Sequence, residues 1–103
     1  MGKPDKILTD NIPQIQALMR QYGVQKAYAF GSAVKGTMTA KSDVDFIIKF
    51  PDDMHFVTYY DNYVGLMHAL ENLLHKDIEL VAEETLQNRY LIKSIDSHKM
   101  QLL

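Results

Sequence analysis

The sequence predicts an α/β fold in which a small mixed β-sheet packs against helices. Segments with helical periodicity alternate with short apolar segments along the 103 residues, in the order helix, strand, short helix, strand, long helix, strand, helix. No internal repeat or linker interrupts this order, and the length suits one hydrophobic core. We therefore expect residues 1–103 to form a single domain.

The first element is predicted to be an amphipathic helix. Asp10 is a candidate N-cap, Pro13 suits the first turn, and Gly23 is placed to end the helix. The apolar positions between them recur at helical spacing: Ile12, Ile15, Leu18, Met19 and Tyr22.

Two buried strands are predicted to follow this helix. They cover residues 24–30 and 43–50, and Pro51 ends the second strand because proline lacks an N–H for the ladder. A short helix between the strands can begin at Ser32, and Gly36 limits its length.

Residues 54–74 are predicted to form a long helix. At ~100° per residue, its apolar side chains cover an arc of roughly 200°, which is wider than packing on one sheet requires. We favour the interpretation that a second helix covers part of this arc. The predicted C-terminal helix is the candidate for this role. The alternative is a protein–protein surface rich in tyrosine and leucine.

The remaining elements are shorter. Residues 77–81 read as a third strand, and residues 100–103 as a final edge strand. Residues 85–98 have helical periodicity, with these side chains expected to face inward: Leu86, Tyr90, Leu91 and Ile95.

Charge and composition argue against several classes of function. The formal net charge is −2 and the pI is about 6.0, whereas domains that hold duplex DNA are usually strongly basic. No apolar run approaches ~18 residues, and the N-terminus lacks the apolar centre of a signal peptide. The chain has no cysteine, which removes disulfides and thiolate metal sites. We expect a cytoplasmic protein that requires neither a membrane nor a nucleic acid.

The motif that carries chemistry is Gly31-Ser32, ten intervening residues, and Asp43-Val44-Asp45. Along a strand, Asp43 and Asp45 point to the same side with their Cα atoms ~6.6 Å apart. Two carboxylates aimed at one point repel each other unless a cation lies between them. Two divalent ions ~3.5–4 Å apart are the known arrangement for phosphoryl chemistry. Taken alone, the pattern is explained more simply if Asp43 caps the strand and Asp45 pairs with a lysine.

Two further features favour a catalytic site. Gly31-Ser32 ends the preceding strand, where backbone N–H groups at a helix start can hold phosphate oxygens. A third carboxylate, Glu79, lies between aliphatic residues in the strand 77–81. Asp77 shares the face of Glu79 by the period of two and competes for the same role.

The segments Phe30-Gly31-Ser32 and Ser42-Asp43-Val44-Asp45-Phe46 together resemble the signature of the DNA polymerase β nucleotidyltransferase superfamily. Over nearly its full length, the chain is similar to the smallest members of that superfamily, the minimal nucleotidyltransferase (MNT) antitoxin domains. The resemblance implies a polymerase β-like core and a two-metal Mg²⁺ site.

The resemblance also implies a role for each matching residue. Catalysis and metal binding fall to Asp43, Asp45 and Glu79, and nucleotide binding to Gly31, Ser32 and Lys35. Three positions depart from the family pattern. Relatives often have Arg directly after the Gly-Ser pair and again two residues later, where this chain has Ala33 and Lys35, and the third acid is usually aspartate.

By the same resemblance, the expected activity is protein adenylylation in a toxin–antitoxin system. AMP would pass from ATP to a hydroxyl, with a tyrosine of a HEPN-type toxin as the expected acceptor. The alternative is a binding module with a weakened site that neutralises its partner by stoichiometric association. Transfer to a small molecule, as in aminoglycoside nucleotidyltransferases, ranks third because those enzymes carry extra domains. The wide apolar arc is also compatible with a homo-oligomer.

Overall fold

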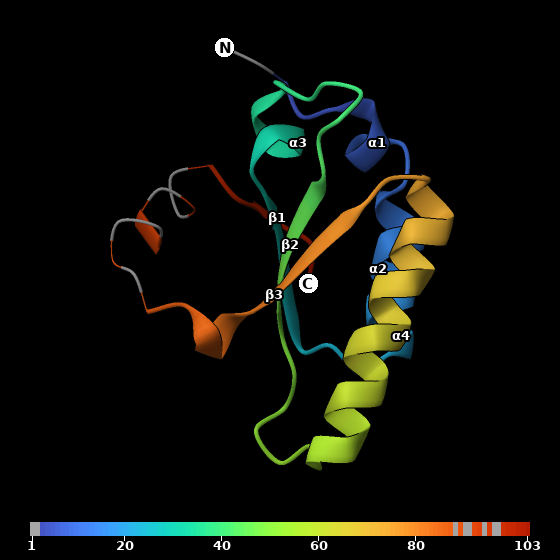
Figure 1. Cartoon of the computed structure of the whole chain (residues 1–103), viewed down its shortest axis with the longest axis vertical. Coiled ribbons are helices and arrows are strands. Elements are labelled where there is room, and N and C mark those ends of the chain that lie inside the picture. The colour runs from blue at the N-terminus through green and yellow to red at the C-terminus, as the bar shows by residue number, and fades with distance from the viewer. Residues whose placement is uncertain (1–2, 88, 90–91, 94, 96–97) are drawn as a thin grey trace.

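The computed structural model shows a four-stranded mixed sheet with its long helices on one face (Figure 1). It describes residues 3–87, 89, 92–93, 95 and 98–103. The strand order is β3-β2-β1-β4, where β1 is Lys26–Phe30, β2 is Val44–Lys49, β3 is Ile78–Ala82 and β4 is Met100–Gln101. β1 pairs antiparallel with β2 and β4, whereas β2 pairs parallel with β3. The predicted α/β fold with a mixed sheet is therefore confirmed, as is the final edge strand.

The core lies between the sheet and two helices, α2 (Ile12–Gln21) and α4 (Phe56–Leu74), which lie side by side (Figure 1). The inward side chains of β2 are fully buried, namely Val44, Phe46 and Ile48. They meet apolar side chains from both helices: Ile15, Met19, Leu66, Leu70 and Leu74. Burial of apolar surface at about 25 cal/mol per Å² is the main stabilising contribution to such a layer.

The N-terminal segment differs from the prediction. A short helix, α1 (Lys6–Thr9), precedes α2, and Asp10 caps the end of α1 rather than the start of the next helix. Asp5 begins α1 by accepting a hydrogen bond from the backbone N–H of Ile7 at 2.9 Å. Leu8 is fully buried, so its packing attaches α1 to the core. A helix this short has no amphipathic period to detect, which is why the sequence pattern missed it.

The C-terminal segment lies on the face of the sheet opposite α4 (Figure 1). It begins with a 3-10 helix, η1 (Glu83–Thr85), and its Leu86 and Ile95 then line a cavity against Ile47 of β2. The described residues Leu86, Ile92 and Ile95 thus pack on the sheet and do not cover the apolar arc of α4, although Thr85 lines a cavity beside that helix. Among the residues predicted to face inward here, Tyr90 and Leu91 lie outside the described residues.

The first turns of α4 consequently keep apolar side chains in solvent. Phe56, Val57 and Tyr60 are 77%, 49% and 67% exposed. We call these three residues the α4 apolar patch. Within the described part of the chain, no helix is both long and apolar enough to cross a bilayer.

Gly65 allows α2 and α4 to approach closely, which leads to a stability prediction. A Cβ atom at this position would lie 2.7 Å from Cε1 of Tyr22. Although alanine favours a helix interior over glycine by about 1 kcal/mol, we expect Gly65→Ala to destabilise the protein by about 1–2 kcal/mol through overpacking. Urea unfolding would measure this change. In a Tyr22→Ala background the same substitution should become stabilising, and a destabilising effect there would contradict the packing explanation.

Candidate active site

The predicted acids gather on the sheet face that α2 and α4 leave uncovered, here called the open face. Val44 and Phe46 are buried in the core, so Asp45 between them points to the open face. The strand register places Asp45 opposite Phe30 of β1 and opposite Glu79 of β3. These three positions form a row across the sheet at the start of β2, which we call the acidic row.

The Gly31-Ser32 turn touches this row directly. Gly31 has φ 74° and ψ −152°, and a Cβ atom there would lie 2.2 Å from Oδ2 of Asp45. Only glycine satisfies both constraints, because side chains disfavour this backbone conformation and the carboxylate fills the space. Ser32 then begins α3 (Ser32–Lys35), which ends at Gly36 in the left-handed conformation, as predicted.

Electrostatics confirm how close the carboxylates lie. The pKa of Asp45 is raised from 3.8 to about 7 by burial, then by a hydrogen bond shared with Glu79, and by repulsion from Glu79 and Asp43. Asp43 lies exposed just before β2. The structure thus brings both Asp43 and Glu79 within electrostatic range of Asp45.

Asp77 and Glu79 occupy different structural positions. Its backbone carbonyl accepts a hydrogen bond from the N–H of Val44 at 3.0 Å, which fixes the start of β2 against β3. Its side chain is exposed and precedes β3, whereas Glu79 stands in register with Asp45. Of the two competing candidates, Glu79 is therefore the acid that meets Asp45.

The donor chemistry of these carboxylates fits a divalent cation. Mg²⁺ prefers oxygen ligands, and Asp43, Asp45 and Glu79 supply only oxygen. Within the described residues, however, no group of three or more His, Asp or Glu side chains is already arranged as a metal site. Asp43, Asp45 and Glu79 are the residues that would hold such a cation, and its positive charge would offset the repulsion that Asp45 experiences from its acidic neighbours.

The departures from the family pattern at positions 33 and 35 can be examined in the structure. Ala33 is fully buried, and its carbonyl accepts a hydrogen bond from the backbone N–H of Asp5 at 2.7 Å. Its side chain faces the core, so this position cannot serve a phosphate. Lys35 is the last residue of α3 and is exposed.

Sequence reasoning missed Lys76, which holds the loop that leads to Asp43. The ammonium group of Lys76 donates to the backbone carbonyls of Thr39 and Ala40, each at 3.2 Å. Within the same loop, Ser42 Oγ accepts from the N–H of Thr39 at 2.9 Å. A lysine between a helix and an acidic strand gives no sequence signal of this contact, since its partners are backbone atoms far along the chain.

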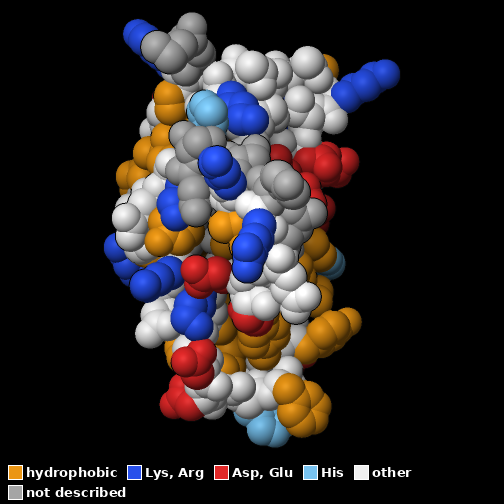
Figure 2. Space-filling model, turned by 90° about the vertical axis from the view of Figure 1, so that its left-hand side faces the viewer, with side chains coloured by type: hydrophobic (Ala, Val, Ile, Leu, Met, Phe, Trp, Pro, Cys, Tyr) orange, Lys and Arg blue, Asp and Glu red, His pale blue; other side chains and the backbone are white. Residues whose placement is uncertain are grey.

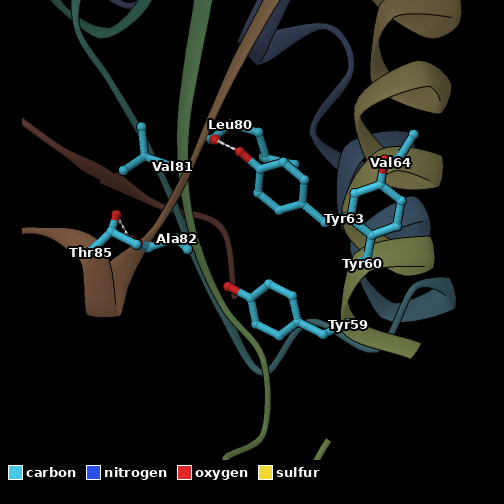
Figure 3. A pocket seen from close by; sticks show the side chains of 8 residues that line it. All are labelled: Tyr59, Tyr60, Tyr63, Val64, Leu80, Val81, Ala82 and Thr85. Carbon is cyan, nitrogen blue, oxygen red and sulfur yellow. Dashed lines mark hydrogen bonds between the residues drawn. The ribbon is translucent and has the colours of Figure 1, made fainter. Parts of the chain in front are cut away.

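A separate cavity of about 540 Å³ lies between α4 and β3 and is shown in Figure 3. We call it the tyrosine cavity after Tyr59, Tyr60 and Tyr63, which line it. The Tyr63 hydroxyl donates to the carbonyl of Leu80, and the Thr85 hydroxyl donates to that of Ala82 at 2.7 Å (Figure 3). Two carbonyls of the edge strand β3 therefore already have donors, which disfavours addition of a further strand at this edge.

Positive and negative side chains both lie on the side of the molecule shown in Figure 2. Several Lys and Arg side chains lie across its middle, and acidic side chains lie at its upper right, near its centre and at its lower left (Figure 2). Positive charge of this kind attracts polyanions such as triphosphates.

A polymerase β-like sheet with a Gly-Ser turn set against paired carboxylates defines a nucleotidyltransferase core. Consistent with this, the family described as Polymerase beta, Nucleotidyltransferase matches residues 13–103. The chain therefore belongs to the polymerase beta nucleotidyltransferase family.

Curated relatives point the same way. Two Methanocaldococcus jannaschii proteins, each named "Putative protein adenylyltransferase", are 29% identical to this chain over 79 residues. Those residues cover 77% of this chain and 77% and 76% of the two relatives.

Solved structures share the fold. A toxin–antitoxin structure with AMP-PNP has a TM-score of 0.71 and 25% identity, covering 90% of this chain and 73% of that one. A structure described as a "putative minimal nucleotidyltransferase" has a TM-score of 0.72 and 22% identity, covering 90% of each chain. A structure of the tri-AMPylated Shewanella oneidensis HEPN toxin in complex with MNT antitoxin has a TM-score of 0.63 and 22% identity. The match covers 92% of this chain and 71% of that one. The resemblance inferred from the sequence is thereby confirmed.

The Gly31 contact predicts unequal effects of two glycine substitutions. Gly31 and Gly36 both have φ 74°, but a side chain at Gly31 also meets the Asp45 carboxylate. We expect Gly36→Ala to cost about 1–2 kcal/mol of unfolding free energy through backbone strain, and Gly31→Ala to cost clearly more. Urea unfolding of both variants would measure this, and equal costs would argue against the contact.

The raised pKa of Asp45 predicts a pH dependence of stability in divalent-free buffer. A carboxyl whose pKa is higher in the folded chain binds its proton more readily there, so stability falls as the pH rises from 3.8 to about 7. Because solvent screens this partly exposed group, we expect the free energy of unfolding to fall by only about 1–2 kcal/mol between about pH 5 and about pH 8. Urea unfolding at both pH values would measure it.

Asp45→Asn should remove this part of the pH dependence, whereas Asp52→Asn, at a site 93% exposed, should leave it. Adding Mg²⁺ near pH 8 should restore stability to the wild type. An unchanged pH profile in Asp45→Asn would show that another group is responsible.

Proposed function

We propose that this chain transfers AMP from ATP to a tyrosine hydroxyl of a HEPN-type partner toxin, with Mg²⁺ as cofactor. The observation that carries the proposal is the close approach of Gly31 to the Asp45 carboxylate, which stands in register with Glu79. This contact places a group that attracts divalent cations beside a backbone turn that can hold phosphate oxygens.

The residues divide the reaction between them. The turn at Gly31 and Ser32, with Lys35, binds the β- and γ-phosphates. Asp43, Asp45 and Glu79 would hold Mg²⁺, which would supply positive charge to neutralise the triphosphate.

In the transfer step, the phenolic oxygen bonds to the α-phosphorus while the α–β phosphoanhydride bond breaks. Pyrophosphate leaves with the electron pair of that bond. The phenolic proton passes to a carboxylate of the acidic row, and the resemblance to the family assigns this role to Glu79.

The choice of AMP and of a protein acceptor rests on relatives. The curated relatives are named as protein adenylyltransferases, and a structural neighbour at 25% identity is a toxin–antitoxin structure with AMP-PNP. The tyrosine and the HEPN partner follow from the resemblance to MNT antitoxins. A neighbour of the same fold is named as bound to an AMPylated HEPN toxin.

Replacing the acids should abolish transfer while preserving the fold. We expect Asp43→Asn or Asp45→Asn to lower the rate of AMP transfer at least about 100-fold, because transition-state charge loses a partner. The measurement is incorporation of label from [α-³²P]ATP into the partner toxin with Mg²⁺. Asp61→Asn, on the exposed side of α4, is the matched control and should keep full activity. Unchanged labelling in the site variants would overturn the assignment.

Stoichiometric binding is the second candidate, and the α4 apolar patch favours it. Phe56 and Tyr60 expose large apolar surface that a partner could bury. The two candidates separate in a neutralisation assay with Asp45→Asn. Loss of neutralisation supports modification of the partner, whereas full neutralisation supports binding alone.

A further inference from the structure

A second cavity lies on the open face beside the acidic row and belongs to none of the roles assigned above. It has a volume of about 390 Å³, within the range of ligand pockets. Tyr28 and Ile47 form its sheet side, and Leu86, Ile92 and Ile95 of the C-terminal segment form its other side. Two charged side chains, Glu83 and Lys99, complete the lining. We call it the sheet-face cavity.

The strand register fixes where this cavity lies. Tyr28 pairs with Ile47, and Phe30 pairs with Asp45, so the two rows are neighbours on the same face. Two residues along a strand separate the rows by ~6.6 Å. The Gly31-Ser32 turn follows Phe30 on the other side of the acidic row. The acids therefore lie between the phosphate-binding turn and the sheet-face cavity.

We propose that the sheet-face cavity receives the aromatic side chain of the acceptor tyrosine. This inference rests on the proposed function. In phosphoryl-group transfer, the attacking and leaving oxygens stand roughly in line on opposite sides of the phosphorus. When the turn at Gly31 holds the departing pyrophosphate, the attacking hydroxyl must approach from the opposite side of the acidic row. The sheet-face cavity lies on that side.

The walls of the cavity suit an aromatic ring. Ile47 is almost fully buried, Ile95 is buried, and Leu86 and Ile92 are half-buried, so a ring placed here loses water on several sides. The Tyr28 ring adds an aromatic surface, with the Lys99 ammonium 4.4 Å from its centroid. The phenolic oxygen of the bound ring would then point along the sheet toward the acids.

The tyrosine cavity is larger but lies in the wrong place for an acceptor. It is built between α4 and the edge strand β3, with Tyr63 already hydrogen-bonded to the Leu80 carbonyl. α4 packs on the face opposite the acidic row (Figure 1). An attacking group held beside α4 would not stand opposite the Gly31-Ser32 turn.

Filling the sheet-face cavity should weaken acceptor binding and leave the nucleotide untouched. The test variants are Ile92→Trp and Ile47→Phe, and the control is Val64→Trp, which fills the tyrosine cavity instead. We expect the KM for the acceptor protein to rise at least about 10-fold in both test variants. Affinity for AMP-PNP with Mg²⁺, measured by calorimetry, should change less than about 2-fold. The control should match the wild type in both measurements.

A binding experiment on the wild-type chain tests the cavity without catalysis or substitution. N-acetyl-L-tyrosinamide should shift the methyl NMR signals of Ile47, Ile92 and Ile95, and leave those of Val64 in place.

The outcomes separate this inference from the proposed function. Isoleucine shifts in a chain that transfers no AMP would support the cavity and defeat the proposed function. Absence of those shifts, or a larger effect of Val64→Trp, would overturn the cavity assignment. Loss of AMP-PNP affinity in the test variants would also overturn it, since the cavity would then hold the nucleotide base.

Discussion

Repulsion between Asp45 and Glu79 is the constraint on which the rest of the site depends. The parallel pairing of β2 with β3 sets these two carboxyls side by side, and Asp43 adds a third negative charge. Gly31 packs against Asp45 and leaves its carboxyl no room to turn away. The folded chain therefore stores unfavourable charge where it can be neutralised only by a proton or a cation. A binding site that costs stability when empty is commonly a functional one.

The core holds these charges in place from the far side of the sheet. Val44 and Phe46 are anchored under α2 and α4, so Asp45 cannot move without disturbing buried apolar contacts. A register shift of one residue would turn Asp45 into the core and Phe46 into solvent, which burial makes prohibitive. The Lys76 ammonium fixes the loop before Asp43 in a similar way, through backbone carbonyls. Rigid support of this kind is what positions catalytic groups before the substrate arrives.

Local periodicity explains which parts of the structure the sequence could predict. The strands, the long helix and the short helix ending at Gly36 follow from alternation, helical spacing and glycine chemistry, and the acidic row follows from the period of two. Contacts between segments that are distant in the sequence could not be predicted from such patterns. Leu86 and Ile95 line a cavity with Ile47 of β2, and the Asp5 N–H donates a hydrogen bond to the Ala33 carbonyl. Such contacts join distant segments and leave no periodic trace.

The acidic row and the α4 apolar patch lie on different sides of the molecule, so a partner could bind at the patch without blocking the row. The acidic row lies on the open face, and the α4 apolar patch belongs to a helix packed on the opposite face (Figure 1). A partner that buried Phe56 and Tyr60 would leave the Gly31-Ser32 turn open to nucleotide. Burial of that patch would raise the local concentration of any tyrosine the partner carries, without contributing to the transfer step itself. Under the proposed function, stoichiometric association and AMP transfer are therefore compatible in this fold, because a partner bound at the α4 apolar patch would leave the acidic row accessible.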